Sequence, residues 1–220
     1  MEVEIKIRLP SRETYEQVVA LFKIQGLHCR TERQENWFLD GCGAELQSDK
    51  SVFRIRRADI NDRSVMNEGS NDGTEQPLVT FTATIKGNAL LTDGISRVAE
   101  EERSISTELA ERLLRSPSDL GSMSQDHPLL GKLAAKLKHP SDARIIGSYS
   151  TLREVFEWKR WKVEVDATVY TFGEAYEIEI ESPTPEEAKR DIEAFLQANS
   201  VPYGYSQRNK TDNMRAGSIL

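Results

Sequence analysis

The sequence predicts an α+β protein in which about eight β-strands close into a barrel and a smaller number of helices pack around it. The strongest pattern along the chain is period-2 alternation of apolar and charged residues, which is typical of strands whose two faces differ. Period-3.6 patterns are confined to a few short segments. Eight is also about the number of strands at which a closed barrel has room for side chains or one small ligand.

The alternating segments give the expected strands. Residues 2–8 read Glu-Val-Glu-Ile-Lys-Ile-Arg, so that every even position is charged and every odd position is apolar. Other segments alternate in the same way: 52–56, 78–86, 162–166 and 176–181. Further segments show the alternation more weakly: 33–39, 96–105 and 152–158.

The expected helices are fewer and lie between the strands or after them. Ser11 is a suitable N-cap for a helix that ends at Gly26. Short amphipathic helices are expected at 106–115 and 128–138. A longer helix at 184–198 has a proline in its first turn and begins a C-terminal helix and tail.

Two polar stretches interrupt these elements. Residues 58–76 nearly lack large apolar side chains, and we expect a mobile insertion there. Residues 116–127 are expected to form a second loop. Because strands or helices flank both stretches, the sequence predicts a single domain over residues 1–220, with its C-terminal helix and tail at 184–220.

Composition excludes several classes of protein. The 220 residues contain 29 Lys+Arg and 36 Asp+Glu, and the net charge of −7 argues against a generally basic nucleic-acid-binding protein. No apolar run approaches the ~20 residues that span a bilayer, and the first residues do not read as a targeting peptide. Two cysteines are too few for a disulfide scaffold or a thiolate metal site. We therefore expect a cytoplasmic protein that binds neither nucleic acid nor membrane.

The charged faces of the expected strands are segregated by sign. Acidic residues follow one set of strands: Glu2, Glu4, Asp166, Glu177, Glu179 and Glu181. Basic residues follow another set: Arg54, Arg56 and Lys86. Glutamates two positions apart on one strand face stand about 6.6–6.8 Å apart and repel each other unless positive charge lies between them. Ordinary strands with solvated polar faces are the alternative interpretation of the alternation.

A barrel with a charged interior accounts for this segregation. Carboxylates on one wall would bind Mg²⁺ or Mn²⁺, because these cations prefer hard oxygen ligands. Arginines and lysines on the other walls would bind an anion, and metals combined with guanidinium groups are a usual means of holding a polyphosphate. The sequence contains no glycine-rich phosphate-binding motif. Side chains inside the barrel would therefore hold the phosphates.

Several motifs in order along the chain carry a resemblance to a known family. The first is the E-x-E-x-K of residues 2–6. The others are Gln34-x-Asn36-x-Phe38-x-Asp40, Arg54-Ile55-Arg56, Lys86, Asp93-Gly94-Ile95-Ser96-Arg97, Glu100-x-Glu102, Glu164-Val165-Asp166, Tyr170-x-Phe172-Gly173, the glutamates of 177–181, Lys210 and Arg215. The set resembles the CYTH, or triphosphate tunnel metalloenzyme, superfamily over nearly all of residues 1–215. Within this superfamily, the sequence most resembles the small stand-alone plant members, which are similar to inorganic tripolyphosphatases.

The resemblance implies an eight-stranded antiparallel barrel with a central tunnel, and it implies roles for the charged residues. The expected metal ligands are Glu2, Glu4, Asp166, Glu177, Glu179 and Glu181, with Glu100 and Glu102 as secondary candidates. The expected phosphate contacts are Lys6, Arg54, Arg56, Lys86, Arg97 and Lys210. The residues assigned to catalysis are Glu2, Glu4, Lys6 and Glu179. Lys210 would cap the tunnel from the C-terminal segment, with support from Arg215.

The expected activity is Mg²⁺- or Mn²⁺-dependent hydrolysis of a small-molecule triphosphate by a monomer, preferably of inorganic tripolyphosphate to pyrophosphate and phosphate. Alternatives within the family are a class IV-like adenylyl cyclase and a thiamine triphosphatase, and a non-catalytic polyphosphate- or nucleotide-binding module is an alternative of another kind. Asn88 departs from the pattern, because similar proteins carry a second lysine there. Its neutral side chain is expected to weaken one phosphate contact.

Overall fold

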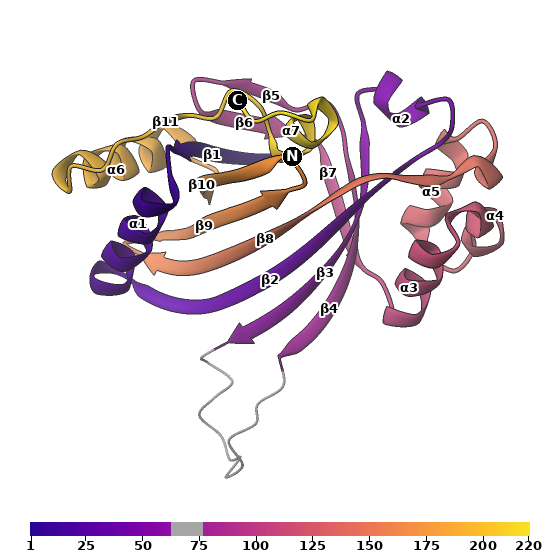
Figure 1. The fold of residues 1–220 in the computed structure, drawn as a ribbon, viewed down its shortest axis with the longest axis horizontal. Helices are drawn as coiled ribbons and strands as arrows, with labels where there is room; N and C mark the ends of the chain where they lie inside the picture. The colour runs from indigo at the N-terminus through magenta and orange to yellow at the C-terminus, as the bar shows by residue number, and fades with distance from the viewer. Residues whose placement is uncertain (63–76) are drawn as a thin grey trace, which may run out of the picture.

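The computed structural model describes residues 1–62 and 77–220, and its central feature is one antiparallel sheet that curls around an interior space (Figure 1). Within these residues the strands run in the spatial order β5-β6-β1-β10-β9-β8-β2-β3-β4-β7, and β11 pairs with β1. Their bounds are β1 Glu2–Leu9, β2 Leu27–Asp40, β3 Val52–Asp62, β4 Leu78–Lys86, β5 Leu90–Thr92, β6 Ile95–Val98, β7 Glu100–Ser104, β8 Arg144–Trp158, β9 Trp161–Tyr170, β10 Gly173–Glu181 and β11 Gly204–Tyr205.

The barrel is closed by the chain itself and not by a continuous hydrogen-bonded ladder. Strands β6 and β7 are separated only by Ala99. Strand β6 pairs with β1, where Val3 faces Arg97, whereas β7 pairs with β4, where Lys86 faces Glu100. The segment expected as one strand at 96–105 is thus bent at Ala99, and its two halves border opposite ends of the sheet. When β6 and β7 are counted as one bent strand and the short strands β5 and β11 are set aside, eight strands surround the interior, which confirms the predicted barrel.

Strand pairing sets which side chains enter the barrel. Lys6 of β1 lies opposite Glu179 of β10, and Glu179 in turn lies opposite Glu164 of β9. The alternate positions, such as Ile5 and Ile178, are at most 1% exposed and belong to the core beneath the outer helices. Charge therefore faces inward and apolar side chains face the helices on these strands, as the alternation predicted.

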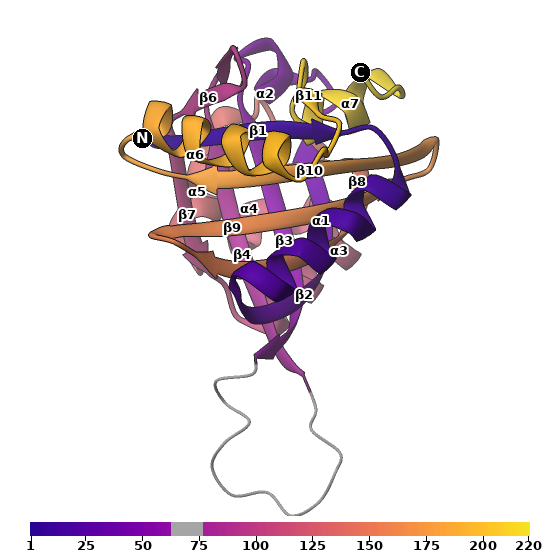
Figure 2. The same ribbon diagram turned by 90° about the vertical axis from the view of Figure 1, so that its left-hand side faces the viewer.

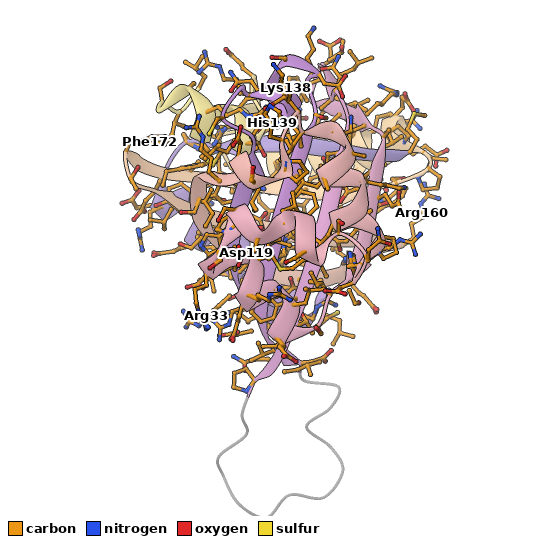
Figure 3. All side chains as sticks on the ribbon, turned by 90° about the vertical axis from the view of Figure 1, so that its right-hand side faces the viewer. Arg33, Asp119, Lys138, His139, Arg160 and Phe172 are labelled. Atoms are coloured by element: carbon orange, nitrogen blue, oxygen red, sulfur yellow. The ribbon has the colours of Figure 1, made fainter. Side chains whose placement is uncertain are left out.

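Two groups of helices cover the outside of the barrel. Figure 2 shows α1 (Arg12–Gln25) and α6 (Pro185–Ala198) lying across β1, β10, β9 and β8. Phe22 of α1 stacks on Phe195 of α6 with 4.6 Å between the ring centroids, so the two helices share one apolar core. Figure 3 shows the second group on the opposite side, formed by α3 (Thr107–Arg115), α4 (Leu120–Met123) and α5 (Pro128–Lys136). This group packs on β3 and β4 through its own core.

The observed elements differ from the expected ones mainly in the loops. The stretch expected as a loop at 116–127 contains the 3₁₀ helix Pro117–Asp119 and α4, and a second 3₁₀ helix spans Pro140–Asp142. Strand β3 extends through residues 58–62, and the remainder of the expected insertion, 63–76, lies outside the described residues.

Two short helices were absent from the expected elements. Helix α2 (Glu45–Ser48) begins beside the Asp40 carboxylate, which accepts hydrogen bonds from the backbone N–H groups of Gly41, Leu46 and Gln47. Helix α7 (Lys210–Ala216) has Asn209 as its N-cap and lies at the same end of the barrel as the β5–β6 hairpin (Figure 1). In the described part of the chain, every helix is too short or too polar to cross a membrane.

Candidate functional site

A cavity of about 1000 Å³ occupies the interior of the barrel. Side chains from the strands line most of it, and the segment around α7 borders it at one end. Most of the charged residues selected from the sequence meet there: Glu2, Glu4, Lys6, Arg54, Arg56, Lys86, Glu100, Glu102, Asp166, Glu179, Glu181 and Lys210. Residues as distant in the chain as Glu2 and Lys210 therefore form one site.

The wall formed by β1, β9 and β10 is a network of buried ion pairs. Lys6 Nζ lies 3.0 Å from Glu4 and 2.6 Å from Glu179. Lys210 Nζ enters from α7 and lies 2.6 Å from Glu179 and 2.8 Å from Asp166. Burial alone would raise the pKa of Glu179, but the charges of Lys210, Lys6 and Arg153 hold that pKa well below its usual range. Glu179 is thus a carboxylate that stays ionised.

Arg153 of β8 joins this network and was not selected from the sequence. Its guanidinium donates to Asp166 at 2.7 and 2.8 Å and to Glu179 at 2.7 Å, and it also pairs with Glu164. The sequence Leu-Arg-Glu-Val around it does not alternate cleanly, so the face of Arg153 was not evident. Its position directly across from Asp166 in the β8–β9 pair is what indicates that Arg153 faces the cavity.

The opposite wall, formed by β2, β3, β4 and β7, carries fewer carboxylates. Arg54 donates to Thr84 at 3.1 Å and to Glu102 at 3.0 Å. Arg56 donates through Nε to the Asn36 side-chain oxygen at 3.0 Å, and it forms no ion pair with any described residue. Burial, together with the charges of Arg54 and Arg153, lowers the pKa of Arg56 to about 10, which leaves it protonated at neutral pH. Among the described residues, no carboxylate lies within ion-pair distance of Arg56, although the charge of Glu102 acts on it from further away.

Negative charge accumulates at the N-terminal end of β1. Lys86 Nζ lies 3.1 Å from Glu2 and 2.5 Å from Glu100. Burial and the neighbouring Glu100 raise the pKa of Glu2, although Lys86 opposes this. Burial also raises the pKa of Glu4, with a contribution from Glu179 against the opposing charge of Lys6. These two carboxylates lack enough nearby positive charge to compensate for their burial.

This donor set fits a divalent cation in its chemistry. The carboxylate oxygens of Glu2, Glu4 and Glu181 are hard ligands of the kind that Mg²⁺ and Mn²⁺ take, and a cation would relieve the uncompensated charge of Glu2 and Glu4. Among the described residues no three acidic, histidine or cysteine side chains already converge in a ligand arrangement. The carboxylates are instead paired with lysine and arginine, as at Glu179.

Comparison with known proteins identifies the family. The sequence matches the CYTH domain family over residues 1–212. The chain belongs to the CYTH domain family. Its match covers nearly the whole barrel and the start of α7, so the charged cavity just described is the interior of a CYTH fold. No curated protein matches the chain in the comparison of sequences.

Solved structures support the CYTH assignment. HpAC1 from Hippeastrum, a candidate adenylyl cyclase with a dominant triphosphatase activity, is 28% identical, with a TM-score of 0.86 over 100% of this chain and 98% of that one. A candidate adenylate cyclase from Bacillus halodurans is 21% identical, with a TM-score of 0.64 over 97% and 96% of the two chains. PH1819 from Pyrococcus horikoshii is 16% identical, with a TM-score of 0.58 over 94% of each chain. The last two show a shared fold alone.

One residue that the CYTH resemblance placed at the phosphates lies elsewhere. Arg97 occupies β6 between Ser96 and Val98, and these two neighbours line the cavity. Because side chains alternate along a strand, Arg97 points out of the barrel. Its side chain is 41% exposed and lies 3.4 Å from Glu186 of α6. The structure thus gives Arg97 no route to a ligand in the cavity, and the phosphate contact expected of it does not fit this position.

The three glutamates of β10 have different surroundings in this CYTH barrel. Glu179 and Glu181 line the cavity. Glu177 is 1% exposed and lies behind it, where it accepts a hydrogen bond from Ser206 at 2.5 Å and lies 3.2 Å from Lys210 and 3.3 Å from Arg8. These contacts make Glu177 a support for the end of the barrel at which Lys210 enters.

The C-terminal segment also reaches the cavity. Arg215 lines it and donates a hydrogen bond to the backbone oxygen of Ser51 at 3.1 Å. Together with Lys210, this bond fixes α7 against both β10 and the start of β3. Arg215 thus holds α7, whose first residue is Lys210, against the neighbouring segment of the chain, and its support of Lys210 in substrate binding stays a prediction.

Proposed function

We propose that the barrel binds a triphosphate, preferably inorganic tripolyphosphate, and hydrolyses it to pyrophosphate and phosphate with a bound Mg²⁺ or Mn²⁺. The observation that carries this proposal is Arg56, a guanidinium that forms no ion pair within residues 1–62 and 77–220 and that faces a cavity with acidic residues on its other wall. Membership of the CYTH family and the triphosphatase activity of HpAC1 support the same reaction.

In this proposal, the basic residues of the cavity hold the phosphate chain. Arg54, Arg56 and Lys86 would bind phosphate oxygens, because guanidinium and ammonium groups form short, charge-assisted hydrogen bonds with them. The same contacts would strengthen as charge spreads over the equatorial oxygens in the transition state. Lys6 and Lys210 are each shared by at least two carboxylates, so their first role is to hold the acidic wall together.

The carboxylates would divide between binding the metal and orienting the lysines of the cavity. Glu2, Glu4 and Glu181 are the residues best placed to hold the divalent cation, which would screen the phosphate charge and lower the pKa of an attacking water. The pKa of Glu2 is raised in the metal-free protein whereas that of Glu179 is depressed, so Glu2 is the carboxylate whose ionised form a cation would stabilise more. Glu179 keeps its charge and orients Lys6 and Lys210.

Adenylyl cyclase activity is the second candidate, because HpAC1 is a candidate adenylyl cyclase. A nucleotide substrate would need a surface that binds its base. Tyr149 is the single aromatic residue of the described chain on the cavity wall. Phe38 and Tyr170 are buried in an apolar cluster, and Tyr176 packs beneath α1. This lining favours a compact, charge-dense ligand over a nucleoside triphosphate or thiamine triphosphate.

Product analysis on a small set of substrates tests the proposal. Tripolyphosphate, ATP and thiamine triphosphate would each be incubated with the protein and Mg²⁺, and phosphate, pyrophosphate and cyclic AMP would be measured. We expect tripolyphosphate to give the highest kcat/KM and excess chelator to abolish turnover. Cyclic AMP as the main product, or a tenfold preference for ATP, would contradict the proposed substrate.

A pair of variants tests whether the cavity is the site. Arg56→Gln should raise KM for tripolyphosphate by about 10- to 100-fold, the usual range for loss of a hydrogen bond from a charged group. Arg57→Gln is the matched control, because Arg57 is the next residue on β3 and pairs outside the cavity with Asp59. Equal effects of the two substitutions would show that Arg56 has no particular contact with the substrate.

A further inference from the structure

Arg56 differs in its contacts from the other cations that the strands place in the cavity. Each of those, like Lys210 of α7, lies within 4.0 Å of at least one carboxylate: Lys6, Arg54, Lys86, Arg153, Lys162 and Lys210. An incoming phosphate has to compete with those carboxylates. Arg215 of α7 also lines the cavity, but it donates to the backbone oxygen of Ser51. Arg56 has instead one hydrogen-bond partner among the described residues, the neutral side chain of Asn36. We propose that Asn36 is a positioning residue that aims Arg56 at the phosphate chain without neutralising its charge.

The geometry fixes Asn36 and Arg56 relative to each other. Asn36 of β2 is 1% exposed and lies directly across from Arg56 in the β2–β3 pair. Its Oδ1 accepts the Arg56 Nε hydrogen bond at 3.0 Å. On its other side, Asn36 lies across from Tyr149 of β8, so it sits inside the sheet and not at an edge. A side chain so enclosed has little freedom to turn away.

Because Arg56 donates to Asn36 through Nε, its two terminal nitrogens remain available to a ligand. An arginine presents five N–H donors in a planar fork, and the two terminal nitrogens match two oxygens of a phosphate or carboxylate. Asn36 takes the donor at the base of the fork, and no described residue accepts from the terminal nitrogens of Arg56. Since Arg56 lines the cavity, these nitrogens are the donors that a ligand can reach.

A carboxylate at position 36 would change this balance. Aspartate has nearly the shape of asparagine, so it would form a buried ion pair with Arg56 over the same 3.0 Å. The pair would offset part of the positive charge that attracts phosphate. It would also remove Asn36 Nδ2, which is buried and has no hydrogen-bond partner among the described residues. The protein with asparagine at position 36 is therefore expected to be less stable than one with aspartate there. This is the outcome expected if the charge of Arg56 serves to bind the ligand.

The test compares Asn36→Asp with Asn61→Asp, and it rests on the proposed function. Asn61 lies on the same strand pair but is exposed, so its substitution adds the same charge outside the cavity. We expect Asn36→Asp to raise KM for tripolyphosphate by about tenfold or more, to change kcat less than KM, and to leave the thermal midpoint equal or higher. Asn61→Asp should leave KM within twofold. A residue with a merely structural role would not couple higher stability to weaker binding.

A second variant separates orientation from charge. Asn36→Leu removes the acceptor without adding charge, and it should raise KM and lower the thermal midpoint. In an Arg56→Gln background, Asn36→Asp should have no further effect on KM, because its influence acts through Arg56. An unchanged KM for Asn36→Asp in an otherwise active protein would overturn the positioning role alone. A wild-type protein that neither binds tripolyphosphate by calorimetry nor hydrolyses it would overturn the proposed function and this inference together.

Discussion

At the scale of single residues, Arg153 and Lys210 each join three carboxylates at the cavity wall, and Arg153 does so from a strand. Arg153 is the common partner of Asp166, Glu164 and Glu179, and Asp166 has no exposed surface. Removing one partner from a buried ion network typically costs about 3–5 kcal/mol, because the remaining charges are left uncompensated. Arg153→Met should therefore lower the free energy of unfolding by about that amount, as measured by urea denaturation.

The matched control for Arg153 is Arg103→Met. Arg103 pairs with Glu101 on the outside of the barrel, and its side chain is 55% exposed. Exposed pairs contribute at most about 1 kcal/mol, so this substitution should have a small effect. Similar losses for the two variants would contradict the assignment of Arg153 as the centre of the acidic wall.

Residue-level chemistry could be predicted where a strand alternates over its full length. The inward-facing residues of β1 and β10 were evident because charged and apolar side chains alternate strictly along these strands. Arg153 could not be found in this way, since its partners lie on two other strands and become its neighbours only after folding. The neutral partner of Arg56 was within a recognised motif, but its role depends on a hydrogen bond that no spacing rule specifies.

At the scale of elements, strict alternation determines which residues of 95–104 face the cavity, and it continues through the bend at Ala99. Before the bend, Ser96 and Val98 line it; after the bend, Glu100 and Glu102 do. The parity of the segment placed Arg97 outside, and the sequence resemblance alone did not reveal this. Helix α7 was not predicted, because its seven residues show little periodicity. Carboxylates of β9 and β10 hold Lys210 at the start of this helix, and these contacts exist only in the folded chain.

Strand parity leads to a paired prediction. Lys86→Ala removes a cation that lines the cavity and should raise KM for tripolyphosphate by about tenfold. Arg97→Ala removes a cation of the outer surface, where exposed ion pairs contribute little, and should leave KM within twofold. Steady-state kinetics on both variants would measure this. A larger effect for Arg97→Ala would mean that β6 does not have the parity described.

At the scale of the whole molecule, the fold gathers both kinds of charge around one space, and ion pairs mix them on both walls, whereas the sequence predicted walls segregated by sign. The chain carries a net charge of −7, yet its interior can attract an anion because several cations meet there. Acidic residues gather on β1, β9 and β10, whereas Arg54 and Arg56 lie on β3 across the barrel. Two apolar cores lie outside these walls, one beneath α1 and α6 and the other beneath α3–α5.

The most direct test of this account is a crystal structure of the protein with Mn²⁺ and a non-hydrolysable tripolyphosphate analogue. The anomalous signal of manganese would locate the cation independently of the ligand. We predict phosphate density against Arg54 and Arg56, and a manganese peak beside Glu2 and Glu4. Phosphate bound only outside the barrel, or manganese distant from both glutamates, would contradict the assignment of the cavity as the site of triphosphate chemistry.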